Sequence, residues 1–185
     1  GDGDFSKSFS KLGMEVFGID VSESSRKNLG ENLKICNLLT KPYPYESETF
    51  DFIFSKSVVE HLREPDVLID ESYRLLKPGG TLICMTPSWK HSYKEAFYID
   101  HTHVTPFTRH SLETICELSG FKAKCDYFYQ LPMTWKYPFL NLGRIIINLL
   151  HLPYRPFSRI KWPTKINKTI RFSKEAMLLC RAYKI

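Results

Sequence analysis

The chain has 185 residues, of which 43% are hydrophobic and 25% are charged, with a formal net charge of +6. This length suits one globular domain with a sizeable core and excludes a second catalytic domain. We see no secretory apolar segment and no run long enough to span a bilayer, so the cytoplasm is the default expectation. The five cysteines contain no CxxC pair, which predicts reduced core residues instead of a zinc site.

Two short strand patterns in the first part of the chain each end in a polar residue. Met14–Ile19 is followed by Asp20, and Ser22 is placed to cap the next helix. If the strand before Asp20 is the second strand of a nucleotide-binding half, the Asp20 carboxylate is placed to accept hydrogen bonds from ribose hydroxyls. Asn37 follows the apolar residues of the segment LKICNLL.

A strand, a helix and a second strand are predicted between Thr49 and Pro87. Residues 50–54 form an apolar run typical of a strand buried on both faces. Apolar residues from Val67 to Leu76 repeat at helical spacing, and residues 77–80, KPGG, are expected to stop that helix. Residues 81–85 form the second strand, so the segment predicts a right-handed crossover unit.

The elements FDFIFS, VVEHL and LLKPGGTL, in this order and spacing, resemble the second half of a class I S-adenosylmethionine-dependent methyltransferase domain. The resemblance covers residues 1–130 and the last strand. It implies a doubly wound, Rossmann-like α/β domain with a mostly parallel sheet and an antiparallel last strand. It also implies methyl transfer from S-adenosylmethionine to a small-molecule or lipid-linked acceptor, which we expect to be at oxygen.

The resemblance also implies a cofactor site. The segment GDGDFS looks like the end of the family's glycine loop, while the family's first strand and its acid are absent from this sequence. We therefore expect either a longer chain or another segment to fill the place of that strand. Asn37 matches the family position that meets the adenine amino group. The candidate cofactor contacts are Gly1, Gly3, Asp20, Val21, Asn37, Leu38 and Ser55.

The acceptor side is expected in the loops at residues 55–61 and 87–107. Methyl transfer to a hydroxyl needs alignment and a base, and histidine suits the second role. We expect His103 to be the base, with His61 and then His101 as alternatives. The spacing of residues 100–103, DHTH, also resembles a metal site, but further ligands are not identifiable, so no metal is expected.

Residues 107–120 predict a helix ended by Gly120, followed by the strand FKAKCDYFYQ. Residues 175–184 predict the last, antiparallel strand. The whole chain, residues 1–185, is therefore interpreted as one methyltransferase domain with an insertion at residues 131–172.

This insertion is rich in bases, aromatic residues and proline. Residues 131–185 contain eleven lysine and arginine residues and one acid, a net charge of +10. An apolar helix of residues 139–152 is too short to span a bilayer but suits peripheral contact with an anionic membrane. The first expectation, however, is a lid-like insertion packed over the active site with its bases in water, and a lid can also contact a membrane. Nucleic acid is not expected as a partner, because no RNA-binding motif accompanies the bases.

Two other functions stay open at this point. A protein of the same fold that binds S-adenosylmethionine without catalysis would account for the incomplete glycine loop. A nicotinamide-dependent oxidoreductase would also use Asp20 for its ribose, but it predicts a third loop glycine and a pattern other than VVEHL after the strand.

Overall fold

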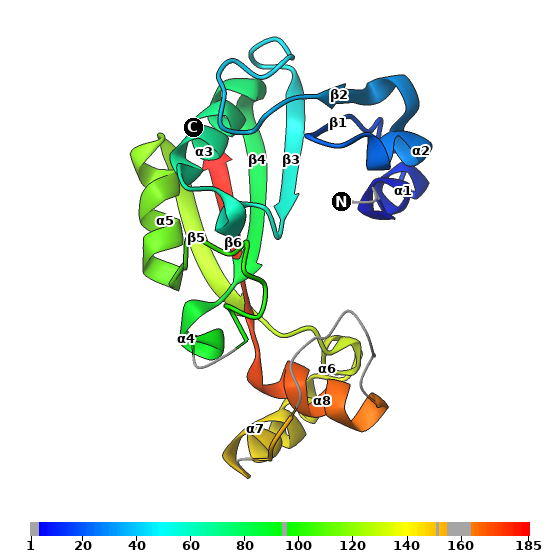
Figure 1. Ribbon diagram of the computed structural model, residues 1–185, viewed down its shortest axis with the longest axis vertical. Helices are drawn as coiled ribbons and strands as arrows, with labels where there is room; N and C mark the ends of the chain where they lie inside the picture. The colour runs from blue at the N-terminus through cyan, green and yellow to red at the C-terminus, as the bar shows by residue number, and fades with distance from the viewer. Residues whose placement is uncertain (1–3, 94–95, 151, 155–163) are drawn as a thin grey trace.

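The computed structural model describes residues 4–93, 96–150, 152–154 and 164–185. The strands are β1 (Gly18–Asp20), β2 (Leu33–Ile35), β3 (Phe50–Lys56), β4 (Leu76–Pro87), β5 (Phe121–Phe128) and β6 (Met177–Lys184). The pairs β1–β2 and β3–β4 are parallel, and β6 runs antiparallel between β4 and β5. The predicted mostly parallel sheet with an antiparallel last strand is confirmed (Figure 1).

Helices complete the α/β architecture. They are α1 (Asp4–Lys11), α2 (Arg26–Leu29), α3 (Pro65–Leu75), α4 (Trp89–Ser92), α5 (Arg109–Leu118), α6 (Pro132–Lys136), α7 (Asn141–Leu149) and α8 (Lys165–Lys174). Helices α3 and α5 pack together against β4, β5 and β6. Helix α1 contacts β3 through Phe5 and Phe9, whose rings both lie against Phe54.

The main core lies between α3, α5 and the four-stranded sheet β3-β4-β6-β5. Alternate residues of β6 point into it, because successive side chains of a strand face opposite sides. Its fully buried members include Ile69, Leu76, Leu82, Leu112, Cys116, Leu178 and Cys180. All five cysteines are free thiols and four are buried, as predicted.

Helix α5 and its ends follow the prediction. Thr108 and Ser111 form a capping box, in which each side chain binds the other residue's backbone N–H. Gly120 has φ of 97°, a conformation that glycine adopts without steric conflict. The cap and the glycine thus fix both ends of the helix locally.

The expected helix stop at residues 77–80 is wrong in one respect. These residues belong to β4, which begins at Leu76, where the prediction began the strand at Thr81. The pairing of β3 with β4 shifts register between Phe50 and Phe52, so the extra residues are accommodated as an irregularity. A side chain at Gly80 would lie 2.8 Å from the Lys77 carbonyl oxygen, which explains a glycine there.

Two other strand predictions need correction. Strand β3 was expected to be buried on both faces, yet Phe52 is 36% exposed, with the Phe9 ring of α1 against it. The strand expected at residues 14–19 is shorter, since β1 comprises only Gly18–Asp20. Among the described residues, no strand ladder joins β1–β2 to the four-stranded sheet. Ring contacts of Phe17 and Tyr45 with Phe50 connect the two sheets instead.

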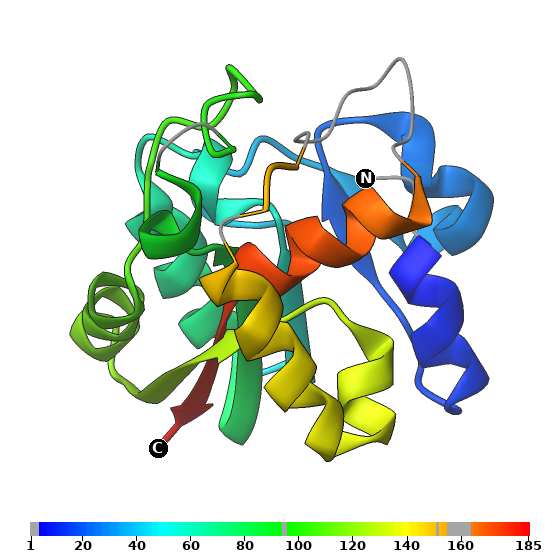
Figure 2. The ribbon, with the colours of Figure 1, turned by 90° about the horizontal axis from the view of Figure 1, so that it is seen from below.

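The described part of the insertion forms three helices beyond the strand ends. Helix α8 crosses below the sheet, with α6 and α7 beside it (Figure 2). The helix expected at residues 139–152 is α7, preceded by the short 3-10 helix η4 (Pro138–Leu140). No helix within the described ranges has the length and apolar character needed to cross a membrane.

Candidate functional site

Two loops meet beyond the carboxyl ends of β3 and β4. The first contains the 3-10 helix η3 (Val59–His61), and the second contains residues 97–105. The backbone carbonyl of Glu60 accepts hydrogen bonds from the N–H groups of Val104 and Thr105, at 2.9 and 3.0 Å. These bonds hold the second loop against the first.

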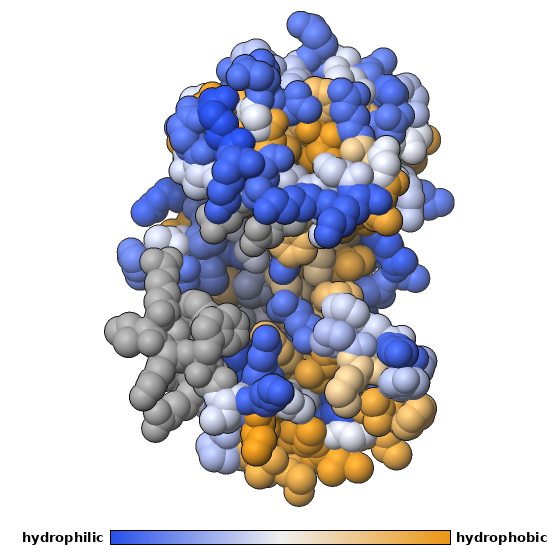
Figure 3. Space-filling view, turned by 90° about the vertical axis from the view of Figure 1, so that its right-hand side faces the viewer, coloured by the Kyte–Doolittle hydropathy of each residue, from blue (hydrophilic) through white to orange (hydrophobic). Residues whose placement is uncertain are grey.

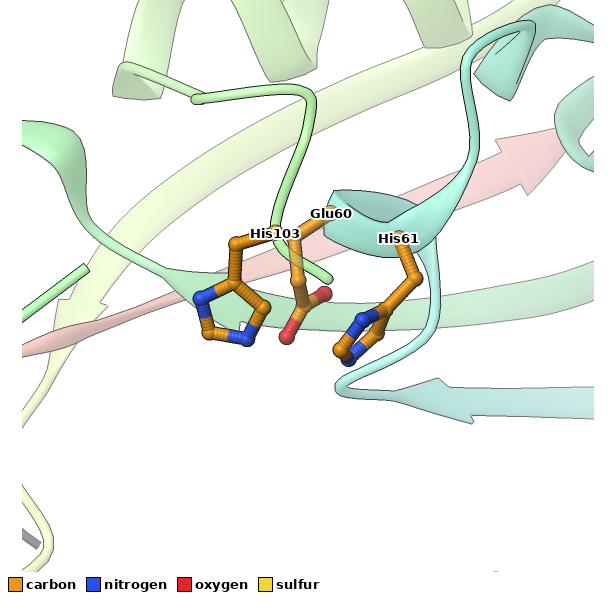
Figure 4. Close-up of side chains that lie close together, drawn as sticks. All are labelled: Glu60, His61 and His103. Carbon is orange, nitrogen blue, oxygen red and sulfur yellow. The ribbon is translucent and has the colours of Figure 1, made fainter. Parts of the chain in front are cut away.

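The meeting of the loops brings His61 and His103 together, with 4.7 Å between their ring centroids (Figure 4). The His103 Nδ1 lies 2.7 Å from the Phe97 carbonyl oxygen. The His61 Nδ1 lies 3.3 Å from the carbonyl oxygen of Thr102 and 2.8 Å from its hydroxyl. The Phe97 carbonyl only accepts, so Nδ1 of His103 donates to it. The Thr102 hydroxyl donates to Asp100 at 2.6 Å and therefore accepts from Nδ1 of His61. Each Nδ1 thus carries the proton and each Nε2 keeps its lone pair. Both Nε2 atoms can therefore accept a proton.

Glu60 is the third member of this cluster, and the sequence reasoning missed it. Its side chain is fully buried, and one carboxylate oxygen, Oε2, accepts a hydrogen bond of 2.9 Å from the Thr86 hydroxyl. The other oxygen, Oε1, has no hydrogen-bond partner among the described residues. Burial raises the pKa of Glu60, while its hydrogen bonds and the charges of His61 and His103 act in the opposite direction. The motif VVEHL contained the signal, because its acid directly precedes the histidine.

Glu60, His61 and His103 each place one potential ligand atom within 4.8 Å of the other two. This set could hold a metal ion as well as share a proton. It differs from the set weighed in the sequence, because the neighbouring His101 is exposed and lies outside the cluster. Asp100 binds Thr102 through its side chain, which lowers the pKa of Asp100 and shapes the turn.

The candidate cofactor residues at the first two strands gather at one end of the small sheet. The Cys36 N–H donates to the Asp20 carbonyl at 3.0 Å, so Asp20 and Asn37 follow adjacent strand ends. The Asp20 carboxylate accepts from Ser22 N–H at 2.9 Å, and the Asn37 side-chain oxygen accepts from Leu39 N–H at 3.0 Å. Both side chains are thus oriented by their own turns.

The other cofactor candidates have different surroundings. Ser55 is buried near the end of β3, and its hydroxyl has no partner among the described residues. Val21 is 66% exposed, and Leu38 is half-buried with its carbonyl bound by the Tyr43 hydroxyl. Gly1 and Gly3 lie outside the described residues.

A cavity of about 450 Å³ lies between the strand ends and the helices of the insertion. Its walls come from α1, β3, β4, β5, α6 and α8, and they are mostly apolar. The lining residues are Phe5, Phe54, Lys56, Met85, Phe128, Gln130, Pro132, Trp135, Lys168 and Phe172. Met85 lines the cavity and directly precedes Thr86, which binds Glu60, so both sites include the same end of β4. Glu60, His61 and His103 are not among the lining residues, and consecutive side chains of a strand face opposite sides.

Comparison with known proteins agrees with this architecture. Residues 1–84 match the model of a protein family described as a methyltransferase domain. A methyltransferase structure from Archaeoglobus fulgidus, described as S-adenosylmethionine-dependent, superimposes with a TM-score of 0.68 at 21% identity, covering 100% of this chain and 82% of that one. Residues 1–84 are therefore similar to a methyltransferase domain, and the whole chain shares its fold with that methyltransferase.

The chain spans less than half the length of the first curated relatives it matches. The ubiquinone biosynthesis O-methyltransferase of Cereibacter sphaeroides is 31% identical over 93 residues, which is 46% of this chain and 38% of that protein. The [4+2]-cyclase SpnF has the same fold, with a TM-score of 0.63 at 16% identity, covering 100% of this chain and 71% of that one. The family match includes Asp20, Asn37, Ser55 and Glu60, whereas His103 and the insertion lie beyond it.

Proposed function

We propose that the protein transfers a methyl group from S-adenosylmethionine to an oxygen of a small-molecule acceptor. The observation that carries this proposal is the cluster of Glu60, His61 and His103 in the loops that follow β3 and β4. A mostly apolar cavity includes the ends of the same two strands. Open α/β sheets bind their ligands at this edge. The O-methyltransferase name of the Cereibacter sphaeroides relative supports oxygen as the acceptor atom.

The described residues fit the cofactor. We assign Asp20 to the ribose hydroxyls and Asn37 to the adenine amino group, because a carboxylate and an amide oxygen can each accept more than one hydrogen bond. The buried hydroxyl of Ser55 has no partner within the described part of the chain and is suited to a further polar group of the same ligand. Gly1, Gly3, Val21 and Leu38 stay candidates for backbone and apolar contacts.

When bound, S-adenosylmethionine supplies an electrophilic methyl group on a sulfur that is already a good leaving group. The protein then has to align the acceptor and remove a proton from its hydroxyl. We assign the proton to Nε2 of His103, which is held in the accepting tautomer by Phe97. His61 is the alternative base in the same cluster, and Glu60 stabilises the imidazolium that forms. His101 becomes the weakest candidate because it lies outside the cluster.

The walls of the cavity suggest the kind of acceptor. Aromatic side chains dominate the lining, and Lys56 and Lys168 add two bases to it. These features favour an aromatic or lipid-linked acceptor that carries an anionic group. We also propose a cytoplasmic protein that is peripheral to an anionic membrane, as the net charge of +10 in residues 131–185 suggests.

Replacing Asp20 with alanine is expected to weaken S-adenosylmethionine binding by about 1 to 3 kcal/mol, because a charge-assisted hydrogen bond to the ribose is lost. Isothermal titration of wild type and variant measures this difference. Glu31→Gln is a matched control, since Glu31 is an exposed acid in the same region. Unchanged affinity of the Asp20 variant would remove Asp20 from the site.

The function itself is tested by incubating the full-length protein with S-adenosylmethionine and a panel of phenols and catechols, with and without an alkyl chain. We expect equal amounts of methyl ether and demethylated cofactor, detected by mass spectrometry. Cofactor binding without any product would support a binding protein, and a rearranged acceptor with intact cofactor would indicate chemistry of the SpnF kind. Binding of a nicotinamide cofactor instead would support the oxidoreductase.

The same assay tests whether a metal is needed. We expect full turnover after treatment with EDTA, because proton transfer through His103 requires no Lewis acid. Loss of turnover on chelation, restored by one divalent cation, would assign Glu60, His61 and His103 to a metal instead.

A further inference from the structure

Helix α7 has its apolar side outward. The side chains at positions 142, 145, 146 and 149 share one face of a helix, since residues three and four apart are neighbours. Leu142 is 65% exposed and Leu149 is 69% exposed, and both isoleucines between them are exposed as well. The opposite face contains Asn141, Arg144 and Ile147, which are the less exposed residues. A surface helix normally turns its apolar face to the protein core and its polar face to solvent, which is the opposite of the arrangement of α7.

The polar residue of the inner face is held in place. The Arg144 guanidinium stacks on the Tyr129 ring, with 3.7 Å between its central carbon and the ring centroid. Its Nε also lies 3.3 Å from the Asn141 side-chain oxygen. The stacking on Tyr129 and the packing of α7 on α8 hold the rotation of α7, so its outward apolar face is a property of the packing.

The apolar surface continues beyond α7. Met133, Trp135 and Phe139, in and after α6, are all at least half exposed. Figure 3 shows hydrophobic atoms gathered at the end of the molecule formed by α6 to α8. An exposed apolar surface of this kind marks a binding surface more often than it marks a free one.

The segment that contains this surface has basic residues and no acidic ones. Residues 131–174 contain nine lysine and arginine residues and no aspartate or glutamate. Two copies of the surface facing each other would bring like charges together, which disfavours a contact between copies of this chain. An anionic bilayer satisfies both features at once, because apolar side chains enter the acyl region while the bases meet the headgroups.

We propose that the outward face of α7, with the exposed side chains of α6, is the surface through which this protein docks on an anionic phospholipid bilayer. The inference rests on the proposed membrane contact and names the residues that make it. Helices α6 and α8 also line the cavity, through Trp135 and Lys168. Docking through α7 would therefore bring the cavity next to the bilayer, so that a lipid-linked acceptor reaches it over a short path.

Flotation with vesicles tests the surface. The vesicles are phosphatidylcholine alone and phosphatidylcholine with about 30% phosphatidylglycerol, across a salt series. The double variant Ile145→Asp/Leu149→Asp removes the apolar face without touching a buried side chain, because α7 has none. The matched control is Leu118→Asp, since Leu118 is 83% exposed on α5, outside the insertion. The bases are tested by Lys136→Gln/Lys165→Gln against Lys122→Gln/Lys124→Gln on β5.

We expect wild type and both controls to bind the anionic vesicles at low salt. The α7 variant should lose at least about tenfold in partitioning, because two apolar anchors become charged. The Lys136/Lys165 variant should bind more weakly than its control and with less dependence on salt. Absence of wild-type binding to anionic vesicles, or equal loss in the Leu118 control, would overturn the proposal.

Sedimentation velocity and cofactor titration on the same samples separate the remaining outcomes. A wild-type dimer that Ile145→Asp/Leu149→Asp converts to a monomer, without vesicle binding, would assign the surface to a second copy and overturn the bilayer. We expect the α7 variant to keep its cofactor affinity and its turnover on a soluble acceptor. This result would show that methyl transfer does not depend on membrane docking. Vesicle binding by a protein that shows no methyl transfer would instead refute the proposed function alone.

Discussion

Replacing His103 with glutamine is expected to lower turnover by roughly two orders of magnitude or more, while S-adenosylmethionine affinity stays nearly unchanged. Glutamine can still donate a hydrogen bond to the Phe97 carbonyl, but it cannot accept the acceptor's proton. The comparison therefore isolates proton transfer from positioning. Steady-state kinetics with saturating acceptor, and isothermal titration of the cofactor, measure the two quantities.

The pH profile provides a second readout for the same variant. Wild-type turnover should fall on acidification, because a protonated imidazole cannot take the proton of the hydroxyl, and this acidic limb should be missing in His103→Gln. The control is His101→Gln, a histidine on the same turn that lies outside the cluster. If the His103 variant turns over as fast as wild type, His103 is not the base. Either His61 is then the base, or the protein contributes only by aligning the acceptor.

Replacing Glu60 with glutamine is expected to lower turnover by about tenfold to a hundredfold and, at the same time, to stabilise the fold at neutral and alkaline pH. Glutamine keeps an oxygen for the Thr86 hydroxyl but has no charge with which to stabilise a protonated His103. The fold gains because an ionised carboxylate is no longer buried.

The sign of the stability effect follows from the raised pKa of Glu60, which results from burial. Between the unfolded and the folded pKa, the folded state binds more protons, so wild-type stability decreases as pH rises through that window. The glutamine variant does not lose stability in this window, because its side chain does not ionise. Its melting temperature should therefore exceed that of wild type by a margin that is absent in acid and grows as pH rises.

Thermal unfolding across a pH series measures this margin. Burial raises the pKa of Glu60, while its hydrogen bonds and the imidazoles of His61 and His103 act in the opposite direction. Burial also raises the pKa of the Cys84 thiol, with smaller contributions from Cys180 and Glu60. Glu117→Gln, at an exposed acid of α5, is the control and should show no such trend. A margin that shrinks as pH rises would contradict the assignment of Glu60 as a buried, destabilising carboxylate.

The elements that could be predicted from the sequence are those whose causes lie close together along the chain. The Thr108 cap and Gly120 define α5, and the apolar repeat of residues 67–76 defines α3 except at its end. Strand β4 was predicted too short, because its first residues pair with β3 through an irregular register that no local pattern reveals. Similarly, the exposure of Phe52 depends on how α1 covers that face of the sheet, which is a matter of tertiary packing.

The composition of the candidate site was determined partly by sequence and partly by tertiary structure. The order of strand, acidic turn and helix placed Asp20, Asn37 and Ser55 at strand ends, since this follows from chain order in a parallel sheet. The meeting of Glu60 with His103 depends on backbone hydrogen bonds between two loops that are far apart in the chain. The direction of α7 is of the same kind: its residues are apolar on most sides, so the sequence by itself determined only a short apolar helix. The stacking of Arg144 on Tyr129 decided which side faces outward, because the rotation of a helix is set by the neighbours against which it packs.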